Sequence, residues 1–231
     1  TEFDPVNNCL DISGEPWVDN IADGYRAVGT YDGGVYIVPA DTSNAAGVLY
    51  NTKVFDELGL EIPETWDEFL QCCETIQAAG ITPIAAPNSK PTNSQIPFLM
   101  NYYYVQLENP DFAEQYTAHE IDLDSSEAFL RGLQKLSDMV PYLNEDFLAT
   151  GMDECARMLG EGTAAMMVIR TNILTTMEGN CPEAIPDIDF FPLPDLDPET
   201  RGISYWMPNG YAINKDAAEP ELAKKWCEFV T

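Results

Sequence analysis

The stretch from residue 47 to residue 86 constrains the fold most, because a strand, a short helix, a longer helix and a further strand follow one another there without a gap. Residues 48–50 form an apolar run of strand type, and Asn51 or Thr52 can cap the helix that follows. Gly59 can adopt the positive φ that ends a short helix. Two helices are therefore expected to pack on a strand.

A capping box predicts where the second of these helices begins. Pro63 breaks the chain after the first helix, and Thr65 with Glu68 has the T-x-x-E pattern in which each side chain bonds to the other residue's backbone. Gly80 can end the helix. Between these signals, apolar residues recur at helical spacing: Trp66, Phe69, Leu70, Cys73 and Ile76.

Apolar strand patterns alternate with helical patterns along the whole chain, which is typical of an α/β sheet with helices packed on it. The expected strands are 35–39, 47–50, 83–86, 164–169, 188–191 and 211–214. Further helices are expected at 95–107, 125–140, 153–159, 172–178 and 219–230. The helix at 125–140 has an apolar face that is expected to be buried, formed by Phe129, Leu133, Leu136 and Val140.

The charge of the chain excludes two classes of partner. Eleven basic residues against thirty-nine acidic ones leave a formal charge of −28. Nucleic acid and anionic lipid both need a positive surface, so neither is an expected partner. The acids form no long block and are interpreted as a solubility surface rather than as a site for cations or a basic partner. The sequence contains no window of about 18 apolar residues and no basic-then-apolar leader.

Six cysteines occur at spacings that match neither a zinc site nor a disulfide framework. An unpaired set of this size argues against a strongly oxidising compartment. Cys72 and Cys73 are adjacent on a predicted helix, where neighbouring residues point about 100° apart. Cys73 is therefore expected to be buried, and Cys72 to lie near the helix flank.

The sequence offers few residues suited to catalysis. His119 is the only histidine, and its polar surroundings predict a solvated loop residue. A metal site built on several histidines is excluded, and no calcium or phosphate loop is present. We therefore predict no catalytic residue, no metal site and no cofactor. A carbohydrate-active enzyme with paired carboxylates is the alternative, since sequence does not report the separation of two acids.

Several separated blocks, in the right order, resemble the extracellular solute-binding proteins, family 1, of ABC importers, the maltose-binding-protein-like group. The first blocks match the family's dG-vY-vP strand, its lyYN strand and its -lGl-P-TWdEf helix pair. Later blocks match its G-x-aAM strand and its g-aI-k segment. They stand here at Asp32–Pro39, Leu49–Asn51, Gly59–Phe69, Gly162–Met166 and Gly210–Lys215.

The resemblance implies a type II periplasmic-binding-protein-like α/β fold, with most of one lobe and remnants of the other. Residues 1–41 would be a remnant of the first lobe with a hinge strand, residues 42–205 the second lobe, and residues 206–231 the return hinge with a first-lobe helix. Members of the family are exported, so the resemblance implies a cell-surface lipoprotein or a periplasmic protein. Its signal segment is not in this chain, which is read as an internal piece of a longer protein.

The resemblance also places candidate ligand-binding residues. Ser43 or Asn44, in the loop after Pro39, matches a polar sugar contact at the lobe crossing. Asn93 and Gln95 match a position where the family can place a stacking tyrosine, and the aromatic is missing here. Neutral side chains that both donate and accept hydrogen bonds are suited to binding sugar hydroxyls.

A third candidate cluster follows the predicted strand at 164–169. Many relatives place a sugar-stacking tryptophan where this chain has Asn172. The change shifts recognition toward hydrogen bonds and leaves Arg170 free to form a fork to a hydroxyl pair or a carboxylate. Trp206, at the return crossing, could supply an aromatic platform or pack between the lobes.

The resemblance implies a receptor that binds a carbohydrate, expected to be an oligosaccharide, in an interlobe cleft and delivers it to an ABC permease. The expected partners are an oligosaccharide or other small solute and the transmembrane subunits of the permease. A monomer is expected. A non-sugar solute, such as a peptide or a polyamine, is the alternative within the binding class.

Overall fold

The computed structural model describes residues 3–40, 43–207 and 209–231. The lobe boundary expected between residues 41 and 42 lies outside the described residues. The chain divides into two compact units, a small unit of Thr1–Asn44 with Trp206–Thr231 and a large unit of Ala45–Tyr205.

A mixed five-stranded sheet forms the centre of the large unit, with the order β5-β6-β4-β7 and with β8 also paired to β4. β5 and β6 are parallel, while β4 is antiparallel to both β6 and β7. The carboxyl ends of β5, β6 and β7 therefore gather at the edge where β4 begins. The strands are β4 Asn44–Asn51, β5 Thr82–Ile84, β6 Ala164–Arg170, β7 Ile188–Phe191 and β8 Ser204–Trp206.

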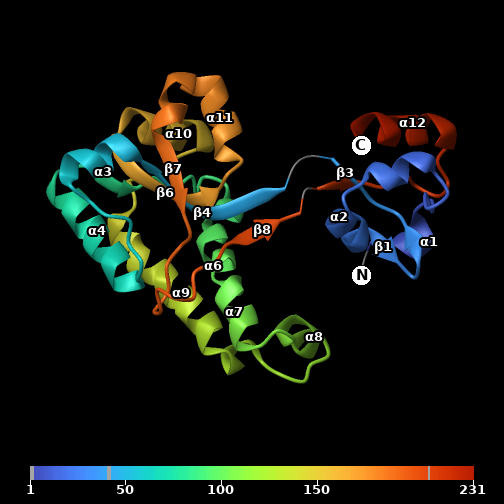
Figure 1. Cartoon of the computed structure of the whole chain (residues 1–231), viewed down its shortest axis with the longest axis horizontal. Helices are drawn as coiled ribbons and strands as arrows, with labels where there is room; N and C mark the ends of the chain where they lie inside the picture. The colour runs from blue at the N-terminus through green and yellow to red at the C-terminus, as the bar shows by residue number, and fades with distance from the viewer. Residues whose placement is uncertain (1–2, 41–42, 208) are drawn as a thin grey trace. The chain divides into compact units, whose positions relative to one another are not determined.

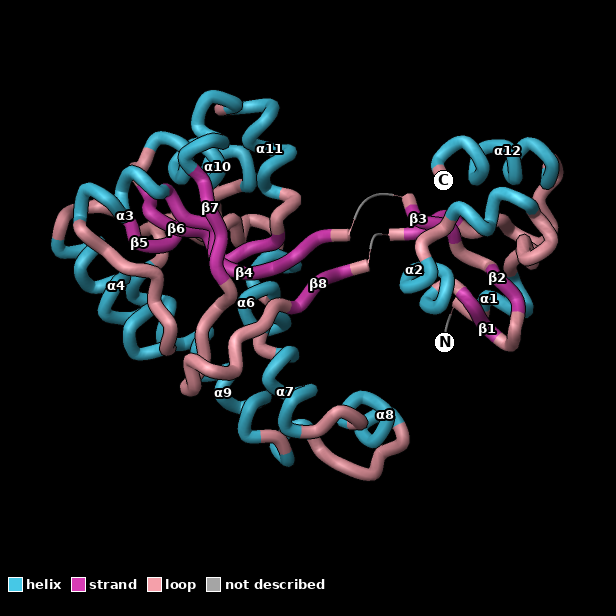
Figure 2. The backbone as a smooth tube through the Cα atoms, viewed as in Figure 1, coloured by secondary structure: helices cyan, strands magenta, loops and turns pink. Residues whose placement is uncertain are grey.

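Helices cover both faces of this sheet. Figure 1 shows α10 and α11 on one side of the strands and α6 with α9 on the other, and Figure 2 shows the same helices in cyan. The α-helices are α3 Thr52–Leu58, α4 Trp66–Ala78, α5 Pro91–Ser94, α6 Ile96–Met100, α7 Tyr102–Glu108, α8 Phe112–Thr117, α9 Glu127–Met139, α10 Met152–Glu161 and α11 Ile173–Asn180. Short 3-10 helices span Leu123–Ser125, Val140–Tyr142 and Pro182–Asp187.

The capping signals of the 47–86 stretch are confirmed. Asn51 caps α3 by accepting hydrogen bonds from the backbone N–H groups of Lys53 and Val54, at 3.0 and 3.3 Å. Gly59 ends α3 with φ 63°. Thr65 and Glu68 form both bonds of the capping box at the start of α4.

The single helix expected at 95–107 is wrong, because the chain forms two helices that meet at Asn101. The Asn101 side chain is buried, donates to the carbonyl oxygen of Ala128 and accepts a bond of 2.8 Å from Lys135. A buried amide with two such partners holds the chain at a break between α6 and α7.

The apolar face expected for α9 is buried only in part. Leu133 and Val140 are 47% and 52% exposed, whereas Gly132 and Lys135 face the interior. Gly132 allows a close approach to α6, since a Cβ there would lie 3.1 Å from Phe98 Cδ2 and from Asn101 Cβ. Lys135 finds buried hydrogen-bond and ion-pair partners. The side of α9 that faces the interior is therefore set by Gly132 and by the partners of Lys135, rather than by the most apolar face of the helix.

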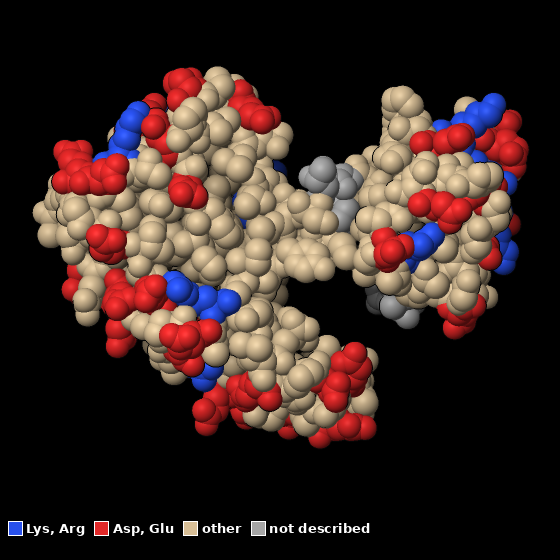
Figure 3. All heavy atoms as spheres, viewed as in Figure 1, with Lys and Arg blue, Asp and Glu red and all other residues tan. Residues whose placement is uncertain are grey.

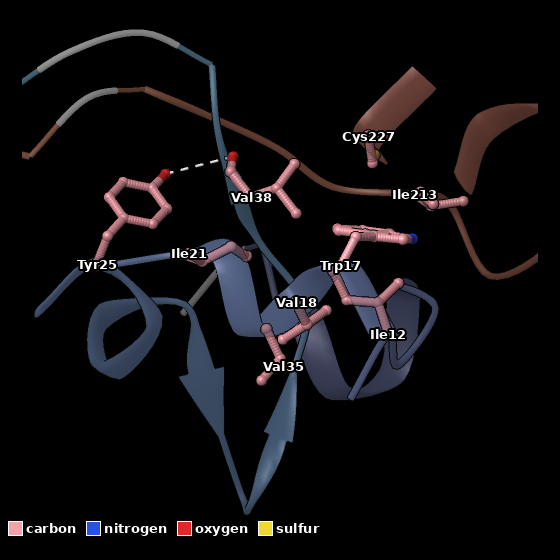
Figure 4. Packing of buried hydrophobic residues seen from close by; sticks show 9 residues of the cluster. All are labelled: Ile12, Trp17, Val18, Ile21, Tyr25, Val35, Val38, Ile213 and Cys227. Atoms are coloured by element: carbon pink, nitrogen blue, oxygen red, sulfur yellow. Dashed lines mark hydrogen bonds between the residues drawn. The ribbon is translucent and has the colours of Figure 1, made fainter. Parts of the chain in front are cut away.

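The small unit has its own core, drawn in Figure 4. Trp17, Val38, Ile213 and Cys227 are among its buried residues. The strand expected at 35–39 is divided into two pieces, and the one expected at 211–214 is shorter and ends at Tyr211. The elements are α1 Pro5–Asn8, a 3-10 helix Pro16–Asn20, α2 Asp23–Val28, β1 Thr30–Tyr31, β2 Gly34–Val35, β3 Val38–Pro39, β9 Gly210–Tyr211 and α12 Pro220–Val230.

All six cysteines are free and buried. Cys73 is fully buried, as expected, and Cys72 is also buried, at 6% exposed. Burial raises the pKa of the Cys72 and Cys155 thiols to about 12. Among the described helices, none has both the length and the apolar character needed to cross a membrane.

Candidate functional site

A cavity of about 250 Å³ opens at the edge of the large-unit sheet where β5 and β6 end. In open α/β sheets, ligands bind outside the carboxyl ends of the parallel strands. The lining is mainly apolar, with three neutral polar residues, Asn88, Asn93 and Ser94. This composition is typical of a small-molecule site, in which a few polar groups orient a ligand on an apolar surface.

One wall of the cavity is the segment that leaves β5 and enters α5 and α6. The Asn93 side chain is 8% exposed and donates a 2.9 Å hydrogen bond to the carbonyl oxygen of Pro87. Ser94 Oγ donates to the carbonyl oxygen of Pro91 at 2.7 Å. Asn93 therefore holds this loop in shape from within the wall, and its predicted direct contact with ligand stays a prediction.

The facing wall is the segment that follows α9, and hydrogen bonds join it to the first. Asn144 Oδ1 accepts from the backbone N–H of Ala86 at 2.9 Å, and Asn144 Nδ2 donates to Thr150 Oγ1 at 2.8 Å. The backbone N–H of Asn88 donates to the carbonyl oxygen of Phe147 at 3.1 Å. Asn144 and Thr150 also lower the pKa of Asp146 by hydrogen bonding to its carboxylate. The two walls are thus joined before any ligand binds.

Phe147 is the aromatic ring of this cavity, and sequence reasoning missed it. It is half-buried, with its backbone hydrogen-bonded to both walls. No periodic pattern marks it, because residues 143–151 form a loop in which alternation and helical spacing carry no information. The signal that could have found it is Asn144, a loop asparagine of the kind that commonly braces its own turn.

Val168 and Arg170 continue the site along β6. Val168 lines the cavity, and residues two apart on a strand share a face, so Arg170 lies on the cavity side of the sheet at the last position of β6. Arg170 pairs with Ala46 of β4, and the backbone N–H of Thr171 donates to the carbonyl oxygen of Ala45 at 2.8 Å. Arg170 Nε is buried and has no hydrogen-bond partner among the described residues.

The other predicted ligand-binding residues lie at element ends. Asn172 is exposed at the N-cap of α11, and Gln95 is exposed between α5 and α6. Asn44 opens β4, and Trp206, half-buried, closes β8. Ser43 is exposed, with its Oγ 4.0 Å from Met207 Sδ. The large unit thus brings Asn93, Gln95, Arg170 and Asn172 to one edge of its sheet.

Residues suited to metal binding do not gather in the described part of the chain. Within residues 3–40, 43–207 and 209–231, no three His, Cys, Asp or Glu side chains are grouped so that they could hold a metal ion. His119 is an exposed turn residue with φ 61°. The cavity can bind and orient a neutral polar solute by its apolar surface and its amide and hydroxyl groups.

The chain matches the family model described as bacterial extracellular solute-binding protein over residues 7–231. It is 39% identical over 84 residues to a multiple sugar-binding protein of Streptococcus mutans, covering 36% of this chain and 20% of that protein. It is 24% identical over 201 residues to an uncharacterized ABC transporter extracellular-binding protein of Pyrococcus horikoshii, covering 84% of this chain and 43% of that protein.

Solved structures share the fold. RafE in complex with raffinose is 22% identical, with a TM-score of 0.82 over 99% of this chain and 60% of that chain. The ligand-free form of RafE from Streptococcus pneumoniae gives a TM-score of 0.69 at 22% identity, over 99% of this chain and 59% of that one. The chain therefore spans about 60% of this solved relative and less than half of the two curated ones.

The likeness to these solved structures shows a type II periplasmic-binding fold, and the cavity lies at the carboxyl ends of β5 and β6 in its sheet. The chain belongs to the bacterial extracellular solute-binding protein family.

Proposed function

We propose that the chain forms the solute-holding part of a carbohydrate receptor of an ABC importer. The observation that carries the proposal is the cavity at the ends of β5 and β6, whose walls are joined by Asn144 and whose surface includes Phe147. Relatives described as sugar-binding, and RafE in complex with raffinose, support a carbohydrate ligand. The large unit would be most of one lobe, and the small unit would contain parts of the other.

An oligosaccharide would use both kinds of surface in the cavity. The C–H face of a pyranose ring packs on aromatic and apolar groups, here Phe147 and Pro97, while its hydroxyls pair with polar side chains at the rim. Candidates for those rim contacts are Gln95, Arg170 and Asn172, and Asn93 braces the wall. Ser43, Asn44 and Trp206 stay predicted ligand contacts. No covalent bond is made or broken.

Delivery to a permease completes the proposed role. The loaded receptor would dock on the transmembrane subunits of an ABC permease, acting as a monomer outside the cytoplasm, either in the periplasm or on a lipid anchor. Closure of two lobes by hinge rotation is the motion by which binding proteins of this kind enclose their ligands.

Thermal unfolding of the full-length gene product, measured against a panel of mono- and oligosaccharides, tests the proposal. At a ligand concentration of 100 times Kd, linkage stabilises the protein by about 2.7 kcal/mol. One saccharide class should raise the melting temperature, and chromatography should recover the saccharide intact. A panel without any such shift would contradict a carbohydrate receptor.

Phe147→Ala locates the binding surface in the same assay. Loss of one aromatic platform should weaken binding about tenfold, or about 1.4 kcal/mol. Leu148→Ala is the matched control, because Leu148 is the next residue and is 72% exposed. Equal binding by Phe147→Ala and the parent would exclude this cavity as the site.

A further inference from the structure

We propose that the saccharide carries a carboxylate and that Arg170 binds it. This inference rests on the proposed function, because it names the chemical class of solute held at the same site.

The first observation is that Arg170 has no ion-pair partner among the described residues of a chain rich in acids. The chain has five arginines and thirty-nine acidic residues. Four of the arginines contact carboxylates: Arg26 with Asp19 and Asp23, Arg131 with Asp195, Arg157 with Glu154, and Arg201 with Glu64. Arg170 has no such contact within the described part of the chain. A partly buried guanidinium without a counter-charge is an unfavourable arrangement that a bound anion would relieve.

The second observation is where the guanidinium lies. Arg170 ends β6 on the same sheet face as Val168, whose side chain lines the cavity. Its Nε is buried and unpaired among the described residues, so one N–H group of the fork remains to be satisfied. Pairing with Ala46 fixes the backbone that carries this side chain. The backbone that carries this donor is therefore fixed at the end of β6 before ligand arrives.

The third observation is the lack of acids among the described residues that line the cavity. None of these lining residues is Asp or Glu, although thirty-nine of the 231 residues are acidic. Asp146, the acid next to Phe147, has its carboxylate engaged by Asn144 and Thr150. Figure 3 shows the contrast on the outer surface, where acidic side chains are spread over the visible face of each unit. An anionic group would thus meet no carboxylate in the described lining, and the adjacent Asp146 carboxylate is held by hydrogen bonds from Asn144 and Thr150.

A carboxylate fits these observations better than a pair of hydroxyls. Guanidinium and carboxylate match as two parallel N–H···O bonds, and a charge-assisted bond is about twice as strong as a neutral one. The formal charge of −28 would repel an anion at long range. At physiological ionic strength that repulsion is screened beyond about 8 Å. The short-range contact with Arg170 therefore determines the affinity for the carboxylate.

Matched ligands test the inference on the full-length gene product. Each of three uronate-bearing oligosaccharides, from pectin, glucuronoxylan and alginate, is compared by calorimetry with its methyl ester and its carboxyl-reduced neutral form. One acid should bind at least tenfold more tightly than both of its neutral forms. A neutral form that binds as well as its acid would overturn the inference and leave the proposed function intact.

Variants of Arg170 then test whether this residue causes the preference for the acid. Arg170→Gln should bind the acid and the ester equally, and Arg170→Lys should keep part of the preference, because a lysine supplies charge without the fork. Arg157→Gln removes the same charge from an exposed pair on α10 and should change nothing. An acid preference that survives in Arg170→Gln would also overturn the inference. Binding of no saccharide, acidic or neutral, to the parent protein would instead reject the proposed function.

Discussion

Lys135 Nζ lies 2.8 Å from Asp195 Oδ1, and the two side chains are only 4% and 5% exposed. The ammonium also donates to Asn101 Oδ1 and to the carbonyl oxygen of Pro194, both at 2.8 Å. It lies 4.9 Å from the ring centroid of Tyr104. This one pair joins α9, the start of α7 and the segment after β7.

Lys135→Met should destabilise the large unit by about 3–5 kcal/mol, because it leaves the buried Asp195 carboxylate without its nearest counter-charge. The free energy of unfolding is measured by urea denaturation. Lys53→Met is the matched control, since the Lys53–Asp187 pair has a lysine that is 73% exposed and should contribute about 1 kcal/mol or less. A loss for Lys135→Met no greater than the control would contradict a stabilising pair.

Glu68 makes the capping box dependent on pH. The backbone N–H groups of Glu64 and Thr65 donate to its carboxylate and lower its pKa below the ordinary value of 4.5. A lowered pKa means that the folded state binds fewer protons, so this stability is present above pH 4.5 and is lost as the pH falls through the folded value.

Glu68→Gln should therefore be less stable than the parent at pH 7, and the difference should shrink as the pH falls toward 3. Melting temperatures across this pH range check it. Glu57→Gln, which removes an exposed carboxylate from α3, is the control for charge alone. A difference for Glu68→Gln that persists unchanged at pH 3 would exclude a role for the ionised carboxylate.

The six buried thiols should not react in the folded protein. Reaction with disulfide reagents requires the thiolate, and burial raises the pKa of Cys72 and Cys155 to about 12. At pH 8 the native protein should show less than one reactive thiol, and all six should react in urea. Rapid labelling without denaturant would contradict the buried positions.

Gly210→Ala should destabilise the small unit by about 1–3 kcal/mol, because overpacking forces neighbours apart. A Cβ at Gly210 would lie 2.2 Å from Ile37 Cγ2 and 2.5 Å from Tyr25 Oη. Gly14→Ala is the control, since a Cβ there meets nothing within 4 Å. Rates of limited proteolysis in the small unit should rise for Gly210→Ala alone, and equal rates would show that the strand accommodates the methyl group.

Local sequence was sufficient where the stabilising contacts join residues three or four positions apart. The Asn51 cap, the Gly59 stop and the Thr65–Glu68 box all have this range, and their prediction is confirmed. β7 was also predicted with its correct limits, since turn residues bound a short apolar run. Resemblance in separated blocks then indicated the family, because those blocks keep their order along the chain.

Long-range contacts account for what sequence reasoning missed. Lys135 is buried because its counter-charge, Asp195, belongs to a distant segment of the chain. The pattern of apolar residues on α9 does not report this pair, and two residues of the predicted apolar face, Leu133 and Val140, are exposed. Phe147 joins the cavity because Asn144 bonds to Ala86 across the site. Helical spacing describes one element at a time. The partner of a buried charge and the neighbours of a loop ring depend on which elements the fold brings together.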